Sequence, residues 1–293
     1  MLWALLSILA ALVWSVVNIV DKYVLSKFFK NPVTAIIIFS IFGLASSFLI
    51  YLFHGFGALT SRVIILSFVA GIFYALMAIF YFKAVKIEEV SRVIALSYLS
   101  PLFVSIIAAL FLGEVFTLTK YLGIILLVIG AVLISVKRFK ISFGKAFWFM
   151  IIATISISIY AIILKYLLNY TDFWTVFALT RIGTFLSLLP IVFTNFPDLV
   201  SVARKFGNKP ILLLFINESL NLIALFLVTV AASIGFITLV NALSSIQPFF
   251  VLLFATILSV FYPRILKEEF SKQTVLLKLV AIAIMFLGAW LVM

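Results

Sequence analysis

Long, uninterrupted apolar runs dominate this sequence of 293 residues and constrain its fold more than any other feature. They lie at residues 2–20, 33–53, 63–82, 91–112, 120–136, 147–168, 173–193, 210–230, 234–261 and 275–292. A helix needs about 20 residues to cross a bilayer, whereas barrel strands are about ten residues long and alternate in polarity. We therefore predict an all-α integral membrane protein with ten transmembrane helices. The run at 234–261 is longer than one span needs, and we expect it to tilt or break near Pro248.

Composition excludes several other classes of protein. The chain is 67% hydrophobic and 10% charged, against about 45–50% apolar and about 25% charged in soluble domains. It has no cysteine, so disulfides and thiolate chemistry are excluded, and its one histidine, His54, stands beside two glycines in a short connector. No aspartate lies mid-span, and no phosphate-cradling glycine loop is present. We therefore expect neither an enzyme nor a metal or cofactor site.

The basic residues give an orientation. The net charge is +12, with sixteen Lys and Arg in the connectors after the odd-numbered runs and three in those after the even-numbered runs. Loops rich in Lys and Arg stay in the cytoplasm. We therefore expect both termini outside a cell (plasma) membrane, with lipid rather than nucleic acid as the surroundings of these charges.

Sequence motifs recur in the two halves of the chain in the same order. Residues 95–104 read ALSYLSPLFV and residues 242–251 read ALSSIQPFFV, identical at six of ten positions. DKYVL at 21–25 corresponds to LKYLL at 164–168, and LLVIGAVLI at 126–134 corresponds to IMFLGAWLV at 284–292. We therefore predict two five-helix repeats, residues 1–140 and 141–293.

An odd number of helices in each copy makes the second repeat inverted relative to the first. Inverted repeats around a midplane site are typical of alternating-access transporters, although duplication for stability alone would leave the same pattern. Because the duplication supplies both halves in one chain, we expect a monomer or a weak homodimer.

One ordered motif resembles a known family. In this motif an apolar helix with a proline is followed by LFLGE and then by a helix containing glycine. Its residues in the first copy are Pro101, Leu110 to Glu114, Gly123 and Gly130. Its residues in the second copy are Pro248, Glu268 or Glu269, and Gly288. The chain thus resembles the EamA-type permeases of the drug/metabolite transporter superfamily over essentially its whole length. The resemblance implies a ten-helix carrier for small metabolites such as amino acids, with a cavity between the halves. Many relatives place both termini inside, which the loop charges here oppose.

One central pair of charges is expected within the membrane. Glu218 lies eight residues into its span with Asn217 and Asn221 beside it, and Arg181 lies near the centre of the preceding span. Polar groups within the membrane mark functional sites. We expect an Arg181–Glu218 contact, with three alternatives for its role. It is a structural ion pair, or Arg181 binds an anionic substrate group, or Glu218 carries a coupling proton.

Other polar and aromatic residues form stripes on the spans. Trp14, Asn18 and Asp21 follow helical spacing, and the further candidates for the substrate site are Tyr74, Tyr160, Asn241 and Gln247. Pro101 and Pro248 are the hinge candidates, with Pro190 a weaker one, because a proline frees a carbonyl and permits a bend. Glu114 is expected to cap or pair at the membrane edge. The predicted function is secondary active transport of a small organic metabolite, and the alternative is a non-transporting scaffold or lipid-handling protein.

Overall fold

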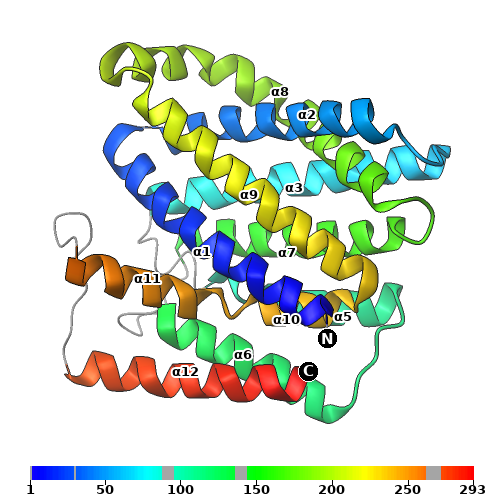
Figure 1. Cartoon of the computed structure of the whole chain (residues 1–293), viewed down its shortest axis with the longest axis vertical. Coiled ribbons are helices and arrows are strands. Elements are labelled where there is room, and N and C mark those ends of the chain that lie inside the picture. The colour runs from blue at the N-terminus through cyan, green and yellow to red at the C-terminus, as the bar shows by residue number, and fades with distance from the viewer. Residues whose placement is uncertain (1, 30, 88–95, 136–143, 262–271) are drawn as a thin grey trace.

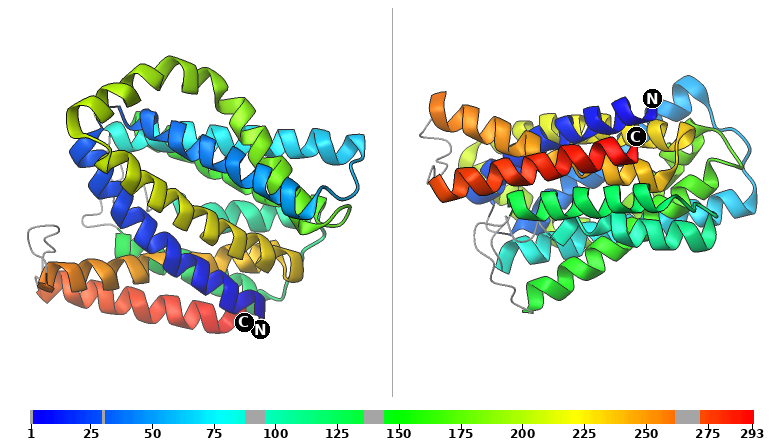
Figure 2. Two further views of the ribbon diagram at one scale, coloured as in Figure 1. Left: turned by 45° about the horizontal axis from the view of Figure 1, so that its top comes forward. Right: turned by 90° about the horizontal axis from the view of Figure 1, so that it is seen from below.

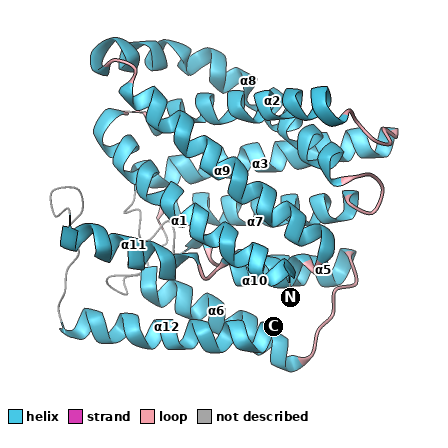
Figure 3. Ribbon diagram, viewed as in Figure 1, coloured by secondary structure: helices cyan, strands magenta, loops and turns pink. Residues whose placement is uncertain are grey.

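The chain is all-α throughout the residues that its computed structural model describes, which are 2–29, 31–87, 96–135, 144–261 and 272–293 (Figure 3). The helices are α1 (Leu2–Phe28), α2 (Ala35–His54), α3 (Ser61–Ile87), α5 (Ser100–Phe111), α6 (Leu118–Ser135), α7 (Lys145–Leu167), α8 (Phe173–Phe206), α9 (Lys209–Ile234), α10 (Ile237–Ser244), α11 (Gln247–Phe261) and α12 (Lys272–Val292). A short 3-10 helix, η1 (Pro32–Thr34), precedes α2. Glu268 and Glu269 lie outside the described residues.

Apolar helices long enough to cross a membrane make up most of the described chain. Seven meet that requirement within these residues, and three shorter apolar helices cover Ser100–Phe111, Leu118–Leu133 and Leu277–Val292. Large apolar side chains on the outside are exposed, Leu110 by 75% and Phe193 by 74%. Such a surface suits lipid rather than water. The prediction of an all-α, multi-pass membrane protein is confirmed.

The helices pack in pairs that join distant parts of the sequence. α1 lies along α9, α2 along α8, α3 along α7, and α6 along α12 (Figures 1 and 2). The two chain ends lie at the same end of the bundle (Figure 1).

Glycines permit the closest of these crossings. A Cβ added to Gly288 of α12 would stand 2.8 Å from the carbonyl oxygen of Gly123 in α6, and one added to Gly123 would stand 2.9 Å from that of Gly288. Between α3 and α8, a Cβ on Gly71 would collide with the backbone of Gly183. Gly71 therefore permits close packing of α3 against α8.

Two helices begin at a turn that carries a proline. The run at 234–261 breaks as expected, since α10 ends at Ser244 and α11 begins at Gln247, one residue before Pro248. Pro101 likewise lies in the first turn of α5, which begins at Ser100. A proline in the first turn loses no helical hydrogen bond, because the N–H it lacks would have no partner there.

Helix α8 departs from the expected boundary. The apolar run ends near residue 193, yet the helix continues through Pro190 and Pro197 to Phe206, where Gly207 adopts φ +67°. The extension is held in part by Asn195, whose Oδ1 accepts a 2.9 Å hydrogen bond from Asn31 Nδ2. Polar residues thus end the hydrophobic run without ending the helix. Pro190 lies well inside a helix rather than near the end of one, and α8 is visibly curved (Figure 1).

Candidate functional site

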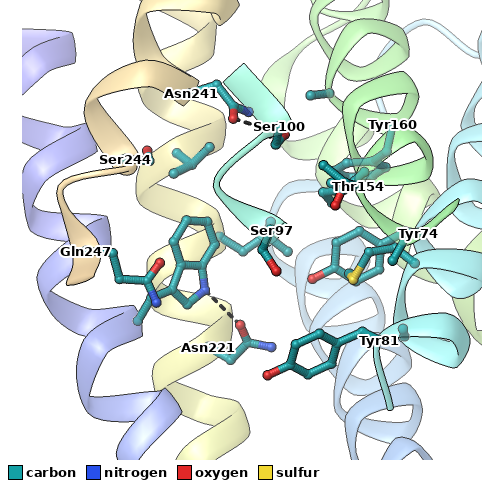
Figure 4. Close-up of a pocket in the computed structure, with 18 of the residues that line it drawn as sticks. Tyr74, Tyr81, Ser97, Ser100, Thr154, Tyr160, Asn221, Asn241, Ser244 and Gln247 are labelled. Carbon is teal, nitrogen blue, oxygen red and sulfur yellow. Dashed lines mark hydrogen bonds between the residues drawn. The ribbon is translucent and has the colours of Figure 1, made fainter. Parts of the chain in front are cut away.

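A cavity of about 320 Å³ lies in the middle of the bundle. Figure 4 shows Asn221 of α9, Asn241 of α10 and Gln247 of α11 across from Tyr74 and Tyr81 of α3 and Tyr160 of α7. The residues of the wall that the sequence singles out as site or hinge candidates are Trp14, Asn18, Tyr74, Pro101, Tyr160, Glu218, Asn221, Asn241 and Gln247. Side chains spread over the sequence thus converge on one space.

A hydrogen-bonded chain of side chains links α1 to α9 at this cavity. Trp14 Nε1 donates to Asn221 Oδ1 at 2.9 Å (Figure 4), and Asn221 Nδ2 donates to Glu218 Oε2 at 3.0 Å. One turn of helix fixes the second bond, because Glu218 and Asn221 are three residues apart. Glu218 is therefore held in place by a neutral amide.

A second carboxylate, Asp21, also lines the cavity. Asn217 Nδ2 donates to its Oδ1 at 2.7 Å. Asp21 was placed at the end of the first span in the sequence, but α1 runs on to Phe28. Two carboxylates from different helices thus face one space, each bonded to an asparagine of α9.

The expected contact between Arg181 and Glu218 is wrong. Both residues are described, and no ion pair within 4.0 Å joins them. Arg181 Nη2 instead donates to Tyr160 Oη at 2.9 Å, and its guanidinium lies 4.1 Å from the ring centroid of Tyr74. The cation–π contact and the hydrogen bond hold Arg181, 2% exposed, behind the two tyrosines and outside the cavity wall. The position of each residue along its span could not show this, because that position leaves the rotation of each helix about its axis undetermined.

The other side of the cavity is bridged between α5 and α10. Ser100 Oγ donates to Asn241 Oδ1 at 3.3 Å (Figure 4) and lies 3.2 Å from Ser158 Oγ of α7. Asn217 and Pro248 are outside the wall, Asn217 as the partner of Asp21.

Some residues of the wall were missed from the sequence. Tyr81, Tyr98, Ser100 and Thr154 all line the cavity. Tyr81 could have been found, because it lies seven residues after Tyr74 and so two helical turns along the same face.

Charged side chains hold the connection between α9 and α10 at one end of the bundle. The Glu114 carboxylate, 4% exposed, accepts hydrogen bonds from the backbone N–H groups of Ile237 at 3.0 Å and Thr238 at 3.1 Å. Lys165 Nζ donates to the carbonyls of Ala232 at 2.6 Å and Gly235 at 2.7 Å. The carboxylate meets the positive end of α10 and the ammonium the negative end of α9. The expectation that Glu114 caps is confirmed.

The described residues hold no group of three or more His, Cys, Asp or Glu able to bind a metal ion. The described wall of the cavity carries two carboxylates, amides and hydroxyls, and aromatic rings.

Comparison with known proteins agrees with this architecture. Residues 1–136 match the model of the EamA-like transporter family. The resemblance drawn from Pro101 and the LFLGE segment is confirmed over these residues. The apolar helices are those of a multi-pass membrane protein. No curated protein matches this chain.

Twenty-nine chains of solved structures match this chain. One crystal structure of a protein superposes with a TM-score of 0.72 at 17% identity, covering 99% of this chain and 96% of that one. At that identity the likeness shows a shared fold alone.

Proposed function

We propose that the protein is a secondary active transporter, not an enzyme, that moves a small organic solute across the plasma membrane by alternating access. The observation that carries this is the central cavity, whose polar side chains come from residues of 1–140 and of 141–293 together. Buried polar side chains that face a shared cavity mark a solute pathway in membrane proteins. The EamA-like match supports the same function.

The helix pairing supports two inverted repeats. We take residues 1–140 and 141–293 as the two copies. Then α1 corresponds to α7, α2 to α8, and α3 to α9. In the same way α5 corresponds to α10 and α11 together, and α6 to α12. Exchanging the copies turns the α1–α9 pair into the α7–α3 pair, and leaves α2–α8 and α6–α12 unchanged. This is the contact pattern that a two-fold axis within one chain would produce. One chain then supplies both halves, so a monomer or a weak homodimer suffices.

The duplicated decapeptide supports the same proposal at the level of single hydrogen bonds. In the first copy the N–H of Leu99 donates to Leu96 O, and in the second the N–H of Ile246 donates to Leu243 O. The next hydrogen bond recurs as well. The N–H of Leu102 donates to Leu99 O in the first copy, and the N–H of Phe249 donates to Ile246 O in the second. The turns that precede α5 and α11 are thus equivalent. They make Pro101 and Pro248 our proposed hinges.

Orientation follows from the charge of the connectors. Both chain ends lie at one end of the bundle (Figure 1), as ten crossings require. The connectors after the odd-numbered runs hold sixteen of the basic residues, and those after the even-numbered runs hold three. We therefore place both termini outside the cell.

Thiol labelling tests alternating access directly, because the chain has no cysteine of its own. Ser97→Cys and Ser244→Cys put single thiols in the cavity wall. Ser233→Cys and Ser201→Cys, both exposed near opposite ends of the bundle, are matched controls. In proteoliposomes of one orientation, a membrane-impermeant maleimide should reach each cavity thiol from both sides, and each control from one side.

The scaffold alternative predicts a different result. A non-transporting or lipid-handling protein would leave the cavity thiols reactive from a single side, or from neither. Labelling confined to one side, with both controls reacting as designed, would refute alternating access.

A further inference from the structure

We propose that the cavity binds a small organic cation and exchanges it for one proton, with the carboxylates of Asp21 and Glu218 as the shared binding site for both. This inference rests on the proposed transport function and gives its substrate class. It comes from the charges around the cavity.

The charged atoms that reach the cavity wall are acidic. Asp21 and Glu218 line it, and its described residues include no Lys, Arg or His. Among the described residues, Asp21 accepts a hydrogen bond from Asn217, and Glu218 accepts one from Asn221. A carboxylate has about four lone-pair sites. Both groups therefore keep acceptor capacity for a ligand that donates.

The charges that the structure describes around the two carboxylates do not sum to zero. Arg181 is within electrostatic range of Glu218, although it forms no ion pair with it. With both carboxylates ionised, the described charges of this region are two negative and one positive, which leaves one negative charge. An uncompensated charge in a low-dielectric interior is strongly unfavourable. One bound proton or one monovalent cation removes that cost, so the two compete for the same charge.

Groups on every helix around the carboxylates bear on this competition. From α3 these are Tyr74 and Tyr81, from α7 Tyr160, from α8 Arg181, and from the turn before α5 Tyr98. Tyr81 lies within electrostatic range of Asp21. The tyrosines supply hydroxyls but no compensating charge, and Arg181 supplies the one positive charge already counted.

The rest of the wall suits an organic ion better than a metal ion. Trp14, Tyr81 and Tyr98 offer aromatic faces, which attract the cationic nitrogen of an amine within about 6 Å of the ring. At about 320 Å³ the cavity is near the lower end of ligand pockets, which span about 300–1,000 Å³. The described residues hold no group of three or more His, Cys, Asp or Glu that could bind a metal ion. An amine with a short apolar body fits all three observations.

The withdrawal of Arg181 from the wall argues against an anionic substrate. Its guanidinium is taken up by Tyr74 and Tyr160. A substrate carboxylate entering the cavity would meet two carboxylates and no cation among the described wall residues. The site therefore selects the amine and rejects its acidic counterpart.

Binding to purified protein in detergent tests the site without requiring transport. The probes are three monoamines, phenethylamine, tyramine and benzyltrimethylammonium, with 3-phenylpropionate as the anionic counterpart of the first. We expect thermal stabilisation by at least one amine and none by the anion. The apparent dissociation constant should rise about tenfold for each unit that the pH falls while the site holds its proton, as one-for-one competition requires.

Two variants and a control locate the site. Asp21→Asn and Glu218→Gln should each weaken amine binding about tenfold or more and abolish its pH dependence. Each variant keeps one carboxylate, which Arg181 balances, so no net negative charge is left for the amine or the proton. Asp198→Asn removes an exposed carboxylate of α8 and should bind as the wild type does. If a variant fails to fold, the probe series and the pH dependence of the wild type still decide.

The outcomes separate this proposal from the transport function. Failure of all three amines to stabilise the protein, equal stabilisation by 3-phenylpropionate, or pH-independent binding would each overturn the cation site. Amine binding of the expected pH dependence, together with labelling of the cavity thiols from one side only, would support the cation site and refute alternating access.

Discussion

Removing the carboxylate of Glu114 should destabilise the protein by an amount that its hydrogen bonds set. Both oxygens are used, Oε1 by the N–H of Ile237 and Oε2 by that of Thr238. A hydrogen bond to a charged group contributes about 1.5–3 kcal/mol. Glu114→Ala leaves two N–H groups at the start of α10 unpaired, so we expect a loss of about 3–6 kcal/mol. Total stability is typically about 5–15 kcal/mol, so this loss is large.

Glu114→Gln separates the two bonds. An amide keeps one oxygen acceptor but replaces the other with a donor, which an N–H group cannot pair with. We therefore expect Glu114→Gln to lose about half as much as Glu114→Ala, about 1.5–3 kcal/mol.

The measurement is reversible unfolding in mixed micelles by titration with SDS, followed by circular dichroism. Asp198→Ala serves as the control, because that carboxylate is exposed on the same bundle. A loss for Glu114→Ala within about 1 kcal/mol of the control would show that the cap contributes little. Equal losses of unfolding free energy for the Gln and Ala variants would show that the two hydrogen bonds do not contribute separately.

Three further perturbations can be measured in the same titration. Gly288→Leu should separate α12 from α6 and cost about 1–3 kcal/mol or more, since its Cβ would stand 2.8 Å from backbone, whereas Leu287→Ala, half exposed, should cost much less. Tyr160→Phe should cost about 1–3 kcal/mol by leaving a buried N–H group of Arg181 unpaired, and no loss would refute the role given to that bond. Partial burial opposes ionisation of Asp172, but hydrogen bonds from the threonine three residues on outweigh it and lower its pKa. The stabilisation by Asp172 is therefore present above the pKa of this group in the unfolded chain, and it is lost as the pH falls through the folded pKa. The difference in unfolding free energy between the wild type and Asp172→Ala should shrink on acidification below about pH 4. A constant difference would refute this.

The spans and the break in the ninth run could be predicted from the sequence because both are local. Apolar length sets where a helix can cross the membrane, and the proline at 248 cannot continue the hydrogen bonding of the helix before it. The same reasoning failed for α8, where Asn195 and two prolines look like a connector but lie within a helix. Polarity ends a hydrophobic run, whereas a helix ends where its backbone turns, here at Gly207.

The candidate site was predicted less completely, because it depends on how helices rotate about their axes. The membership of Trp14, Tyr160 and Asn221 in one cavity follows from polar or aromatic side chains that need a common interior. The separation of Glu218 from Arg181 does not follow, since depth along the membrane leaves the rotation of α8 and α9 about their axes undetermined. The tyrosines that take up Arg181 lie on α3 and α7, and no local pattern links these helices to α8.

The position of Arg181 has a consequence for substrate charge. Because it supplies one positive charge within electrostatic range of Glu218, the described charges around the cavity need one further positive charge for neutrality. Arg181→Met would leave a deficit of two, so the variant should prefer a diamine such as 1,3-diaminopropane to propylamine, where the wild type prefers the monoamine. Burying one uncompensated charge costs several kcal/mol, so the ratio of the two affinities should change by about tenfold or more. Arg181→Lys keeps the charge and should keep the wild-type ratio. An unchanged ratio in a folded Arg181→Met protein would mean that Arg181 does not set the charge of the site.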